Sequence, residues 1–460
     1  MVAFRFKIHR FDVGVLAREF VMIHPQGEGE MKPTSNAGML RAGIWGKAAT
    51  IGIVAATVLA ACGSSSSASS STSSKTTSKS SSGSSASGAA SGSPVVFHVL
   101  LSETGAGAFL GSRGATSLKA QAAYINSQGG INGHPIKLDM KDNESNPSTN
   151  VSLATGWISQ GVHFILNGSL AGVDSAVDAL ATPNGPFIYD LSPGVHPKPG
   201  SMVFSSDIST KSLITADLTY FKSKGYTKIA ALTSTDGSGV DGLTQLKTVL
   251  AEPQFSSFKL LTSQTFDPTA VSVTTQLSVI KSANPQALVV WTTGAPFGTV
   301  VKGMASLGMS NLPTTTTAGN DPYAELHSLS QYLPKNLYIA CGPQNIPLSQ
   351  LPSGPVKSQD QIFSKVITAA GGHPSDAYGL TWDPMQLLVG ALKKLGVNAS
   401  AKQILDYMQG LHNVAGIDGM YNTSVSNHRG LATSDLYVAT WNGNSLTAVS
   451  GPGGVPASNG

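Results

Sequence analysis

Short apolar runs alternate along the chain with longer stretches in which apolar residues recur every three or four positions. The first run, VVFHVLLS, begins at Val95 and predicts a strand. The stretch 112–128 has helical apolar spacing and stops at a Gly-Gly pair, which predicts a helix. Further strands are expected at IKLDMKDN, VHFILNGS, PFIYDLS, KIAALTS, FKLLTSQ, ALVVWTT, NLYIACG and DLYVATWNG.

Helices are expected between these strands. They are predicted around Trp157 and Ile158, through Val173, Val177 and Leu180, up to Gly225, at 240–250, around Leu277 and Ile280, at 300–307, and within 359–409. This alternation predicts an α/β protein whose parallel sheets are covered by helices on both faces. The pattern starts again after Ser206, so two similar α/β units are expected in tandem.

The N-terminal segment has the features of an export signal. Lys32, Arg41 and Lys47 precede the uncharged stretch 48–61, which is shorter than the roughly 20 residues that a membrane span needs. Residues 1–61 are therefore predicted to be a signal peptide. The run LAACG resembles the lipobox of bacterial lipoproteins, which implies that Cys62 is acylated; the alternative is a chance cysteine after an ordinary signal. Four acidic residues precede Met31, so Met31 is an alternative start.

The composition changes sharply after Cys62. Residues 63–93 contain 18 serines and no aromatic residue, and such a composition cannot bury enough apolar surface to fold. We therefore expect residues 62–93 to form a flexible tether and residues 451–460 to form a tail. The second cysteine, Cys341, lies in the apolar run LYIACG and is expected to be a buried structural thiol.

Charge and motifs argue against several classes of function. The net charge is +4, and seven of the 29 Lys and Arg residues lie in the first 61, so the rest has no basic field for nucleic acid. The ten histidines are scattered, no HExxH motif occurs, and Asp139 and Asp142 are more typical of a strand edge and a cap than of a paired-acid site. No catalytic residue, metal or cofactor is expected. The alternative class is an α/β enzyme of flavodoxin-like or hydrolase type.

The glycine loop after the first strand suggests a nucleotide site at first sight. Gly105, Gly107 and Gly111 come close to a GxGxxG fingerprint, but the third glycine arrives one residue late. Glu103 at the start of the loop would also repel a pyrophosphate. Small residues at a helix N-terminus can instead expose backbone N–H groups to a carboxylate or another polar ligand end. We therefore expect this loop to face such a ligand.

Four phrases of the sequence carry a resemblance to a known family. They are SETGAGAFLGSRG, AAYINSQGGINGHPIKLDMKDNESNPS, FILNGSLAG and FIYDLSPG. In order and spacing they resemble the type I extracellular solute-binding proteins of ABC transporters, the branch of the leucine/isoleucine/valine-binding protein. The resemblance continues more weakly to about Trp441. It implies a type I periplasmic-binding-protein fold, with two Rossmann-like lobes whose parallel sheets are joined by three crossovers.

The resemblance also implies where the lobes and the ligand lie. Lobe 1 is expected to comprise 94–208 with about 342–414, and lobe 2 to comprise 209–341 with about 415–450. Ligand would bind in the cleft, at loops that follow the strands. The ligand-binding residues implied for this chain are Leu110, Gly172, Gly194, His196, Ser238, Gly294 and Asn320, although each also suits an ordinary capping turn.

This sequence departs from the amino-acid binders of that family in the second lobe. Those proteins commonly place a tyrosine in the loops that correspond to 236–239 and 293–295, and an acid near 318–320, whereas this chain has Ser238, Gly239, Gly294 and Ala295. A wider, less polar wall is expected, which favours a bulkier or uncharged solute such as an aromatic acid or an amide. Branched-chain amino acids stay an alternative, because a nearby acid could still meet the ammonium group; the candidates are Asp236, Asp241, Asp321 and Glu103.

Together these features predict the role of the protein. We expect a monomeric, lipid-anchored lipoprotein on the outer face of the cytoplasmic membrane that binds a small solute and delivers it to the membrane subunits of an ABC permease. A sensory ligand-binding domain is a further alternative, since such domains share this fold.

Overall fold

The computed structural model describes residues 90–205 and 207–456. The expected signal peptide, the alternative start at Met31 and the lipidation site Cys62 lie outside the described residues. So do the tether up to residue 89 and the tail from residue 457.

The first lobe is built on a five-stranded parallel sheet. Its strands lie in the order β2-β1-β3-β4-β5. Their bounds are β1 (Val95–Leu101), β2 (Ile136–Asp142), β3 (Phe164–Gly168), β4 (Phe187–Asp190) and β5 (Val203–Ser205). Because consecutive side chains of β1 point to opposite faces, the apolar run of this strand supplies two separate cores.

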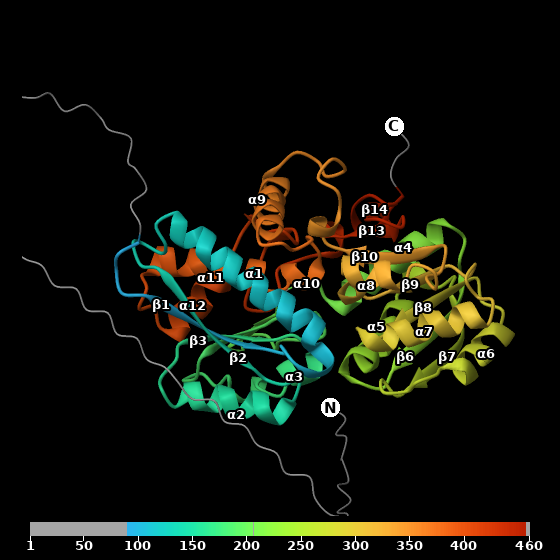
Figure 1. Ribbon diagram of the computed structural model, residues 1–460, viewed down its shortest axis with the longest axis horizontal. Coiled ribbons are helices and arrows are strands. Elements are labelled where there is room, and N and C mark those ends of the chain that lie inside the picture. Colours follow the sequence, from blue (N-terminus) through green and yellow to red (C-terminus); the bar gives the residue numbers. More distant parts are fainter. Residues whose placement is uncertain (1–89, 206, 457–460) are drawn as a thin grey trace, which may run out of the picture. The chain divides into compact units, whose positions relative to one another are not determined.

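Helices cover both faces of this sheet. On one face, Leu100 packs with Trp157 of α2 (Pro147–Ile158). On the other face, Phe97 and Val99 join the main core, against which α1 (Ala108–Ser127), α11 (Trp382–Leu395) and α12 (Ala401–Met408) pack. Figure 1 shows α2 on one side of the sheet and α1 and α11 on the other. The expected α/β layering of this lobe is confirmed.

The second lobe has a seven-stranded sheet in the order β14-β13-β10-β9-β8-β6-β7. The parallel strands are β6 (Lys228–Ser234), β7 (Lys259–Phe266), β8 (Ala287–Trp291), β9 (Thr314–Thr316) and β10 (Leu337–Cys341). β13 (Tyr437–Trp441) and β14 (Leu446–Ala448) add an antiparallel edge. The helices of this lobe are α4 (Thr210–Ser223), α5 (Gly237–Leu250), α6 (Thr274–Ser282), α7 (Ala295–Ser306) and α8 (Tyr323–Ser328).

Three crossovers join the lobes. The chain passes to the second sheet between β5 and α4 and returns after β10. The returning segment forms α9 (Pro355–Ala369), α10 (Asp376–Gly379), α11, α12 and the hairpin β11 (Val414–Ala415) with β12 (Met420–Tyr421). The third crossing leads from β12 to β13. These features confirm the expected fold class, whereas the residue limits of the lobes stay predictions.

The helix expected through Val173, Val177 and Leu180 is wrong. The structure has a single turn, α3 (Ala171–Asp174), and a separate 3-10 turn at Asp178–Leu180. The Asp174 carboxylate accepts hydrogen bonds from the backbone N–H groups of Ser169 and Leu170, at 3.0 and 3.2 Å. This local hydrogen bonding favours a capped turn over a continuous helix.

Several elements begin where a polar side chain caps them. Asn146 accepts from the backbone N–H groups of Ser148 and Thr149 at the start of α2, and Asp236 accepts from Gly239 at the start of α5. α1 begins at Ala108, four residues before the start that the sequence pattern predicted. The glycine loop therefore leads directly into this helix.

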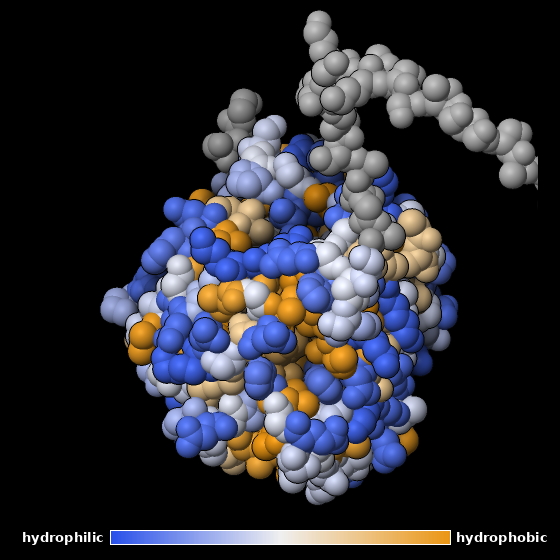
Figure 2. Space-filling view, turned by 90° about the vertical axis from the view of Figure 1, so that its left-hand side faces the viewer, coloured by the Kyte–Doolittle hydropathy of each residue, from blue (hydrophilic) through white to orange (hydrophobic). Residues whose placement is uncertain are grey.

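The surface differs from the core in the usual way. On the face shown in Figure 2, hydrophilic residues surround a smaller group of hydrophobic residues near the middle. Among residues 90–205 and 207–456, no helix combines the length and the apolar character needed to cross a membrane.

Buried Asp217 on α4 should make the stability of the fold depend on pH. It is 1% exposed, and burial raises the pKa of its carboxyl from 3.8 to about 8. The folded state therefore holds a proton that the unfolded chain releases, so this residue contributes less stability as pH rises from about 4 to 8. Asp217→Asn should lose less stability between about pH 5 and pH 8 than the wild type does in urea unfolding.

The matched control is Asp267→Asn, because Asp267 lies in an exposed turn of the same lobe. It should keep the wild-type difference between the two pH values. Equal losses in the wild type and in Asp217→Asn would contradict the role assigned to this carboxyl.

Candidate functional site

The glycine loop is held by the acidic phrase that follows β2. The Asp142 carboxylate accepts from the backbone N–H groups of Glu103 and Thr104, at 3.0 and 3.2 Å, and from the Thr104 hydroxyl at 2.6 Å. The N–H of Gly107 donates to Ser145 Oγ at 2.9 Å. Burial would raise the pKa of Asp142, but the hydrogen bonds of Thr104 and the backbone lower it. These N–H groups of the loop are therefore already occupied by the protein.

Gly111 lets this loop approach its strand closely. A Cβ atom on Gly111 would lie 2.0 Å from the carbonyl oxygen of Ser102. Because such an approach is shorter than any van der Waals contact, a side chain here would push α1 away from the end of β1. Gly111 therefore serves the packing of α1 against β1, and the ligand contact expected of this loop stays a prediction.

The loop after β3 is fixed by a buried amide network. Asn167 donates from Nδ2 to Asp190 Oδ1 at 2.6 Å and to the carbonyl of Asp174 at 3.0 Å. Asn150 of α2 donates to Asn167 Oδ1 at 2.8 Å and to the carbonyl of Val173 at 2.9 Å. Because these bonds are buried, the loop that carries Ser169, Leu170 and Ala171 is held in one position.

A cavity lies between the lobes where the strands end, and we refer to it as the cleft cavity. Its volume is about 40 Å³, close to the ~30 Å³ that one water molecule occupies in the liquid. The lobes are therefore closed, and a solute needs them to open. The lining residues are Leu110, Ser169, Leu170, Ala171, Ser192, Pro193, Gly194, Thr210, Ser238, Asp241, Trp291, Thr293, Thr317, Gly319, Asp376 and Leu380.

The lining combines hydroxyl groups with an apolar wall. Hydroxyls come from both lobes, and those of Ser238 and Thr293 lie 2.8 Å apart, within hydrogen-bonding distance. The apolar part contains Trp291 from the end of β8 and, from the first lobe, Leu110, Leu170 and Leu380. Such a surface suits a small molecule with one polar end and an apolar body.

Two acidic residues reach the cleft cavity. Asp376 is 2% exposed, and burial raises the pKa of its carboxyl well above its ordinary value, with a further rise from the charges of Asp207 and Asp321. The backbone N–H of Asp376 donates to Asp321 Oδ2 at 3.0 Å. The second acid, Asp241, is part of a contact between the lobes.

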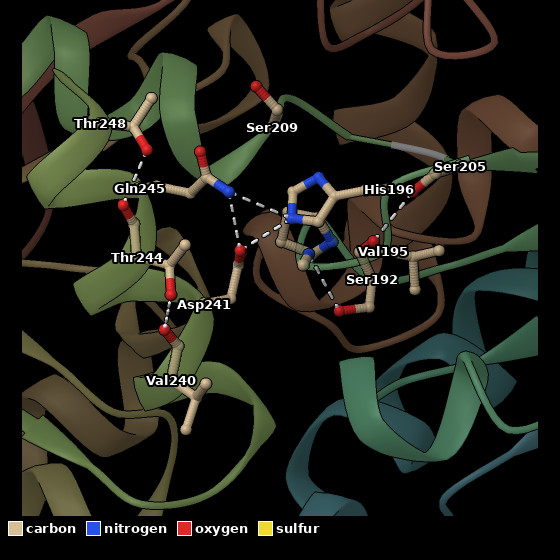
Figure 3. Close-up of polar contacts among 12 residues, drawn as sticks. Ser192, Val195, His196, Ser205, Ser209, Val240, Asp241, Thr244, Gln245 and Thr248 are labelled. Carbon is tan, nitrogen blue, oxygen red and sulfur yellow. Dashed lines mark hydrogen bonds and ion pairs between the residues drawn. The ribbon is translucent and has the colours of Figure 1, made fainter. Parts of the chain in front are cut away.

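His196 and Asp241 form an ion pair across the cleft. His196 Nε2, in the loop after β4, lies 2.7 Å from Asp241 Oδ1 on α5, and Gln245 Nε2 donates to the same oxygen at 3.1 Å. Figure 3 shows these side chains facing one another from the two lobes. Burial would raise the pKa of Asp241, but the hydrogen bonds from His196 and Thr210 lower it.

A second ion pair, between Arg113 of α1 and Glu325 of α8, joins the lobes. Arg113 donates from Nη2 to both carboxylate oxygens of Glu325 on α8, at 2.7 and 2.8 Å, and from Nη1 to the carbonyl of Phe109 at 2.6 Å. One guanidinium nitrogen thus contacts both carboxylate oxygens, while the other holds the backbone of α1. Both contacts join the two lobes in this structure.

Phe109 occupies the space that Gly294 leaves in the second lobe. A Cβ atom on Gly294 would lie 2.6 Å from Phe109 Cε1, and the backbone φ of Gly294 is +82°. The two residues line an outer hollow of about 450 Å³ between α1, α7 and α8. At this position the first lobe therefore supplies an aromatic ring, that of Phe109, which fills the space expected from the missing tyrosine.

The structure places the expected ligand-binding residues at different depths. Leu110, Gly194 and Ser238 line the cleft cavity. Gly172 is exposed and approaches Gly237 across the lobes, while His196 makes the ion pair with Asp241. Their assignment to ligand stays a prediction.

Asn320 organises the loop beside the cleft. Its Nδ2 donates to the carbonyl of Thr292 at 2.7 Å and to Thr316 Oγ1 at 2.8 Å, and its Oδ1 accepts from Gly294 N–H at 2.8 Å. Both Asn320 and Gly294 line the outer hollow and do not line the cleft cavity. Whether either contacts the ligand stays a prediction.

Sequence reasoning missed several residues of the lining, among them Trp291, Asp376 and Leu380. Trp291 is the last residue of β8, a strand that the sequence predicted. Its position at the end of that strand could have identified it as a residue of the cleft. Asp376 and Leu380 come from a segment that follows the second lobe in the chain and returns to the first. No local pattern could reveal that return.

No metal centre accompanies this lining. Within the part of the chain that the structure describes, no group of three or more His, Cys, Asp or Glu side chains is placed to hold a metal ion. Asp139 and Asp142 take structural roles, because Asp139 accepts from Trp157 Nε1 at 3.0 Å and Asp142 holds the glycine loop.

Two lobes that close on a polar and apolar cleft define a solute-binding protein of the type I class. Residues 94–445 match the family model of the periplasmic binding proteins. The chain belongs to this family, as the resemblance implied.

Comparisons with individual proteins agree on the fold. A segment of 91 residues is 31% identical to Leu/Ile/Val-binding protein homolog 1 of Brucella abortus, and it spans 20% of this chain and 24% of that protein. An extracellular ligand-binding receptor from Rhodopseudomonas palustris HaA2 superposes with a TM-score of 0.69 at 19% identity, over 77% of this chain and 99% of that one.

Two further solved structures contain ligands. The branched-chain amino acid transporter substrate binding protein LivJ from Streptococcus pneumoniae, in complex with isoleucine, has a TM-score of 0.63 at 18% identity, over 77% of this chain and 98% of that one. An ABC transporter solute binding protein from R. palustris, in complex with benzoate, has a TM-score of 0.65 at 20% identity, over 80% of this chain and 98% of that one.

A side chain at position 294 should hinder closure of the lobes. Gly294→Ala would meet Phe109 at 2.6 Å, and it adds backbone strain because φ is +82°. We expect solution scattering to give a larger radius of gyration for Gly294→Ala than for the wild type. The double variant Phe109→Ala/Gly294→Ala keeps the strain but removes the clash, so its radius should return toward the wild-type value. A single variant as compact as the wild type would show that Phe109 does not control closure.

Proposed function

We propose that this protein captures a small organic solute in the cleft and delivers it to the membrane subunits of an ABC permease. One observation carries the proposal: hydroxyls and an apolar wall from both lobes meet in the cleft cavity, beside ion pairs that join the two lobes. A protein that closes on its solute can present a distinct surface to a permease. It would act as a monomer, without a cofactor.

The solute class that fits best is a carboxylate with an aromatic or other apolar body. Ser192, after β4 of the first lobe, supplies a hydroxyl that can donate to a carboxylate, and Trp291 with Leu110 and Leu170 supplies the apolar wall. The likeness to a benzoate-binding protein supports this class. A neutral or anionic solute also needs no acidic partner in the cleft.

Branched-chain amino acids are the second candidate. Asp376 lines the cleft cavity, and its carboxylate could pair with an ammonium group. The likeness to an isoleucine-binding protein points the same way. Against this, burial keeps the pKa of Asp376 high, so charging it for an ammonium group costs free energy.

A catalytic role has less support. Among the described residues that line the cleft cavity, no serine or threonine hydroxyl is hydrogen-bonded to a histidine, so the activated nucleophile of a hydrolase is not formed there. We therefore favour binding over catalysis.

Calorimetric titration should separate the two solute classes. We expect benzoate or 4-hydroxybenzoate to bind, and L-isoleucine, L-leucine and L-valine to bind much more weakly. Asp376→Asn should leave binding of an aromatic carboxylate unchanged, because no ammonium group depends on it. If isoleucine binds tightly and Asp376→Asn weakens it by roughly tenfold, about 1.4 kcal/mol, the amino-acid candidate replaces the first.

Membrane attachment follows from acylation of Cys62, which lies outside the described residues. We expect the wild type in the membrane fraction, and Cys62→Ala either unprocessed or released. Cys341→Ala is the matched control, because Cys341 is a buried thiol of β10, and it should partition as the wild type does. A Cys62→Ala protein that migrates and partitions like the wild type would exclude the lipid anchor.

A further inference from the structure

A second, larger cavity lies beside the crossovers, and we refer to it as the crossover cavity. Its volume is about 250 Å³, compared with about 40 Å³ for the cleft cavity. Its walls come from the crossover after β10, from α9, from the start of α8 and from the turn between β13 and β14. The lining residues are Asp321, Tyr323, Gln344, Asn345, Ile346, Pro347, Leu348, Asp360, Ser364, His373, Pro374, Ser375, Trp441, Asn444, Ser445 and Leu446.

Buried polar atoms of this lining have no partner in the protein. Asp360 is 2% exposed, and neither of its carboxylate oxygens accepts a hydrogen bond. Ser375 is 4% exposed, and its hydroxyl is likewise unpartnered, as is Trp441 Nε1. An unpartnered buried polar group costs free energy. The Asp360 oxygens and the Ser375 hydroxyl can accept hydrogen bonds from an occupant that donates, whereas Trp441 Nε1 is a donor that such an occupant leaves unpaired.

Aromatic rings form another part of the wall. The ring of Tyr323 stacks on His373 with centroids 4.8 Å apart, and it meets the ring of Trp441 edge-on at 5.8 Å. The faces of tyrosine and tryptophan attract cations, and most strongly where water is excluded.

The surroundings of the crossover cavity carry excess acid. Burial first, and then the charge of Asp383, raises the pKa of Asp360 to about 9. Burial also raises the pKa of Asp418 well above its ordinary value, with further rises from Asp207, Asp383 and Asp360. A cation next to Asp360 would favour the charged form of this carboxyl and lower its pKa, at the free-energy cost of removing its proton.

We propose that the crossover cavity binds a small organic cation with a primary ammonium or guanidinium group. The cation would donate to Asp360 and Ser375, and its alkyl or aryl body would lie against Tyr323 and Trp441. A metal ion fits less well, since no group of three metal-binding side chains occurs in the described residues. Because the walls come from both lobes, a cation that fits only this arrangement favours it over an open one.

This site is separate from the cleft cavity. The two linings share no residue, although Ser375 of one adjoins Asp376 of the other in the chain. A ligand of the crossover cavity would therefore act beside the transported solute and not in its place.

The test uses n-butylammonium, with 1-butanol as its neutral counterpart and myo-inositol as a neutral polyol. Calorimetry on the full chain should give saturable binding of n-butylammonium and at least about tenfold weaker binding of both neutral compounds. Asp360→Asn, which keeps the side-chain shape, should weaken n-butylammonium by about tenfold or more. Asp217→Asn is the matched control, since it neutralises another buried carboxyl outside this cavity, and it should bind as the wild type does.

A second variant covers the case in which Asp360→Asn fails to fold. Trp441→Leu removes an aromatic wall from a strand near the sheet edge, and it should also weaken n-butylammonium. The proposal is overturned if n-butylammonium does not bind, if a neutral compound binds as tightly, or if its affinity is the same in the wild type and in the folded variants. Binding of benzoate or isoleucine, measured in parallel, should persist in both variants. This measurement therefore tests the proposed solute binding in the cleft cavity independently of the crossover cavity.

Discussion

The two lobes depend on a buried guanidinium at their junction. Arg429, on the third crossover, donates to the carbonyl of Asp207 on the first crossover at 2.8 Å, and to the carbonyls of Val195 and Pro193 at 2.5 and 3.2 Å. Burial lowers the pKa of this arginine, while the negative charge of Asp207 raises it. Next to it, His428 stacks on Phe204 of β5 with ring centroids 4.3 Å apart. A charge buried at this point is tolerated only because its donors are used, so the crossovers and the loop after β4 are fixed together.

From this junction the lobes close with the ends of their strands facing each other. Asp142 and Asn167 hold the loops at those ends in place through several hydrogen bonds. What remains adjustable is the distance between the lobes. Two ion pairs, His196 with Asp241 and Arg113 with Glu325, and the contact of Phe109 with Gly294 favour closure.

Buried aspartates are the other recurring feature of the junction. Their pKa values are raised chiefly by burial, and several raise one another. The resulting electrostatic character differs between the two cavities. The cleft cavity has hydroxyls and an apolar wall with its acids bonded or protonated, which suits a carboxylate. The crossover cavity has a buried carboxyl with unpartnered oxygens beside aromatic rings, where we propose a cation.

The sequence by itself determined the elements and the class of fold, because apolar periodicity reports which face of a strand or helix is buried. The runs at VVFHVLLS and ALVVWTT became interior strands, and Asn146 in the phrase KDNESNP became the cap of α2, whose bonds are local. Tertiary structure alone decided which residues meet. His196 pairs with Asp241 of the second lobe, and Asp376 reaches the cleft from just over two hundred positions beyond Leu170. Neither contact leaves a trace in spacing, because both arise only when the crossovers bring the ends of two separate sheets together.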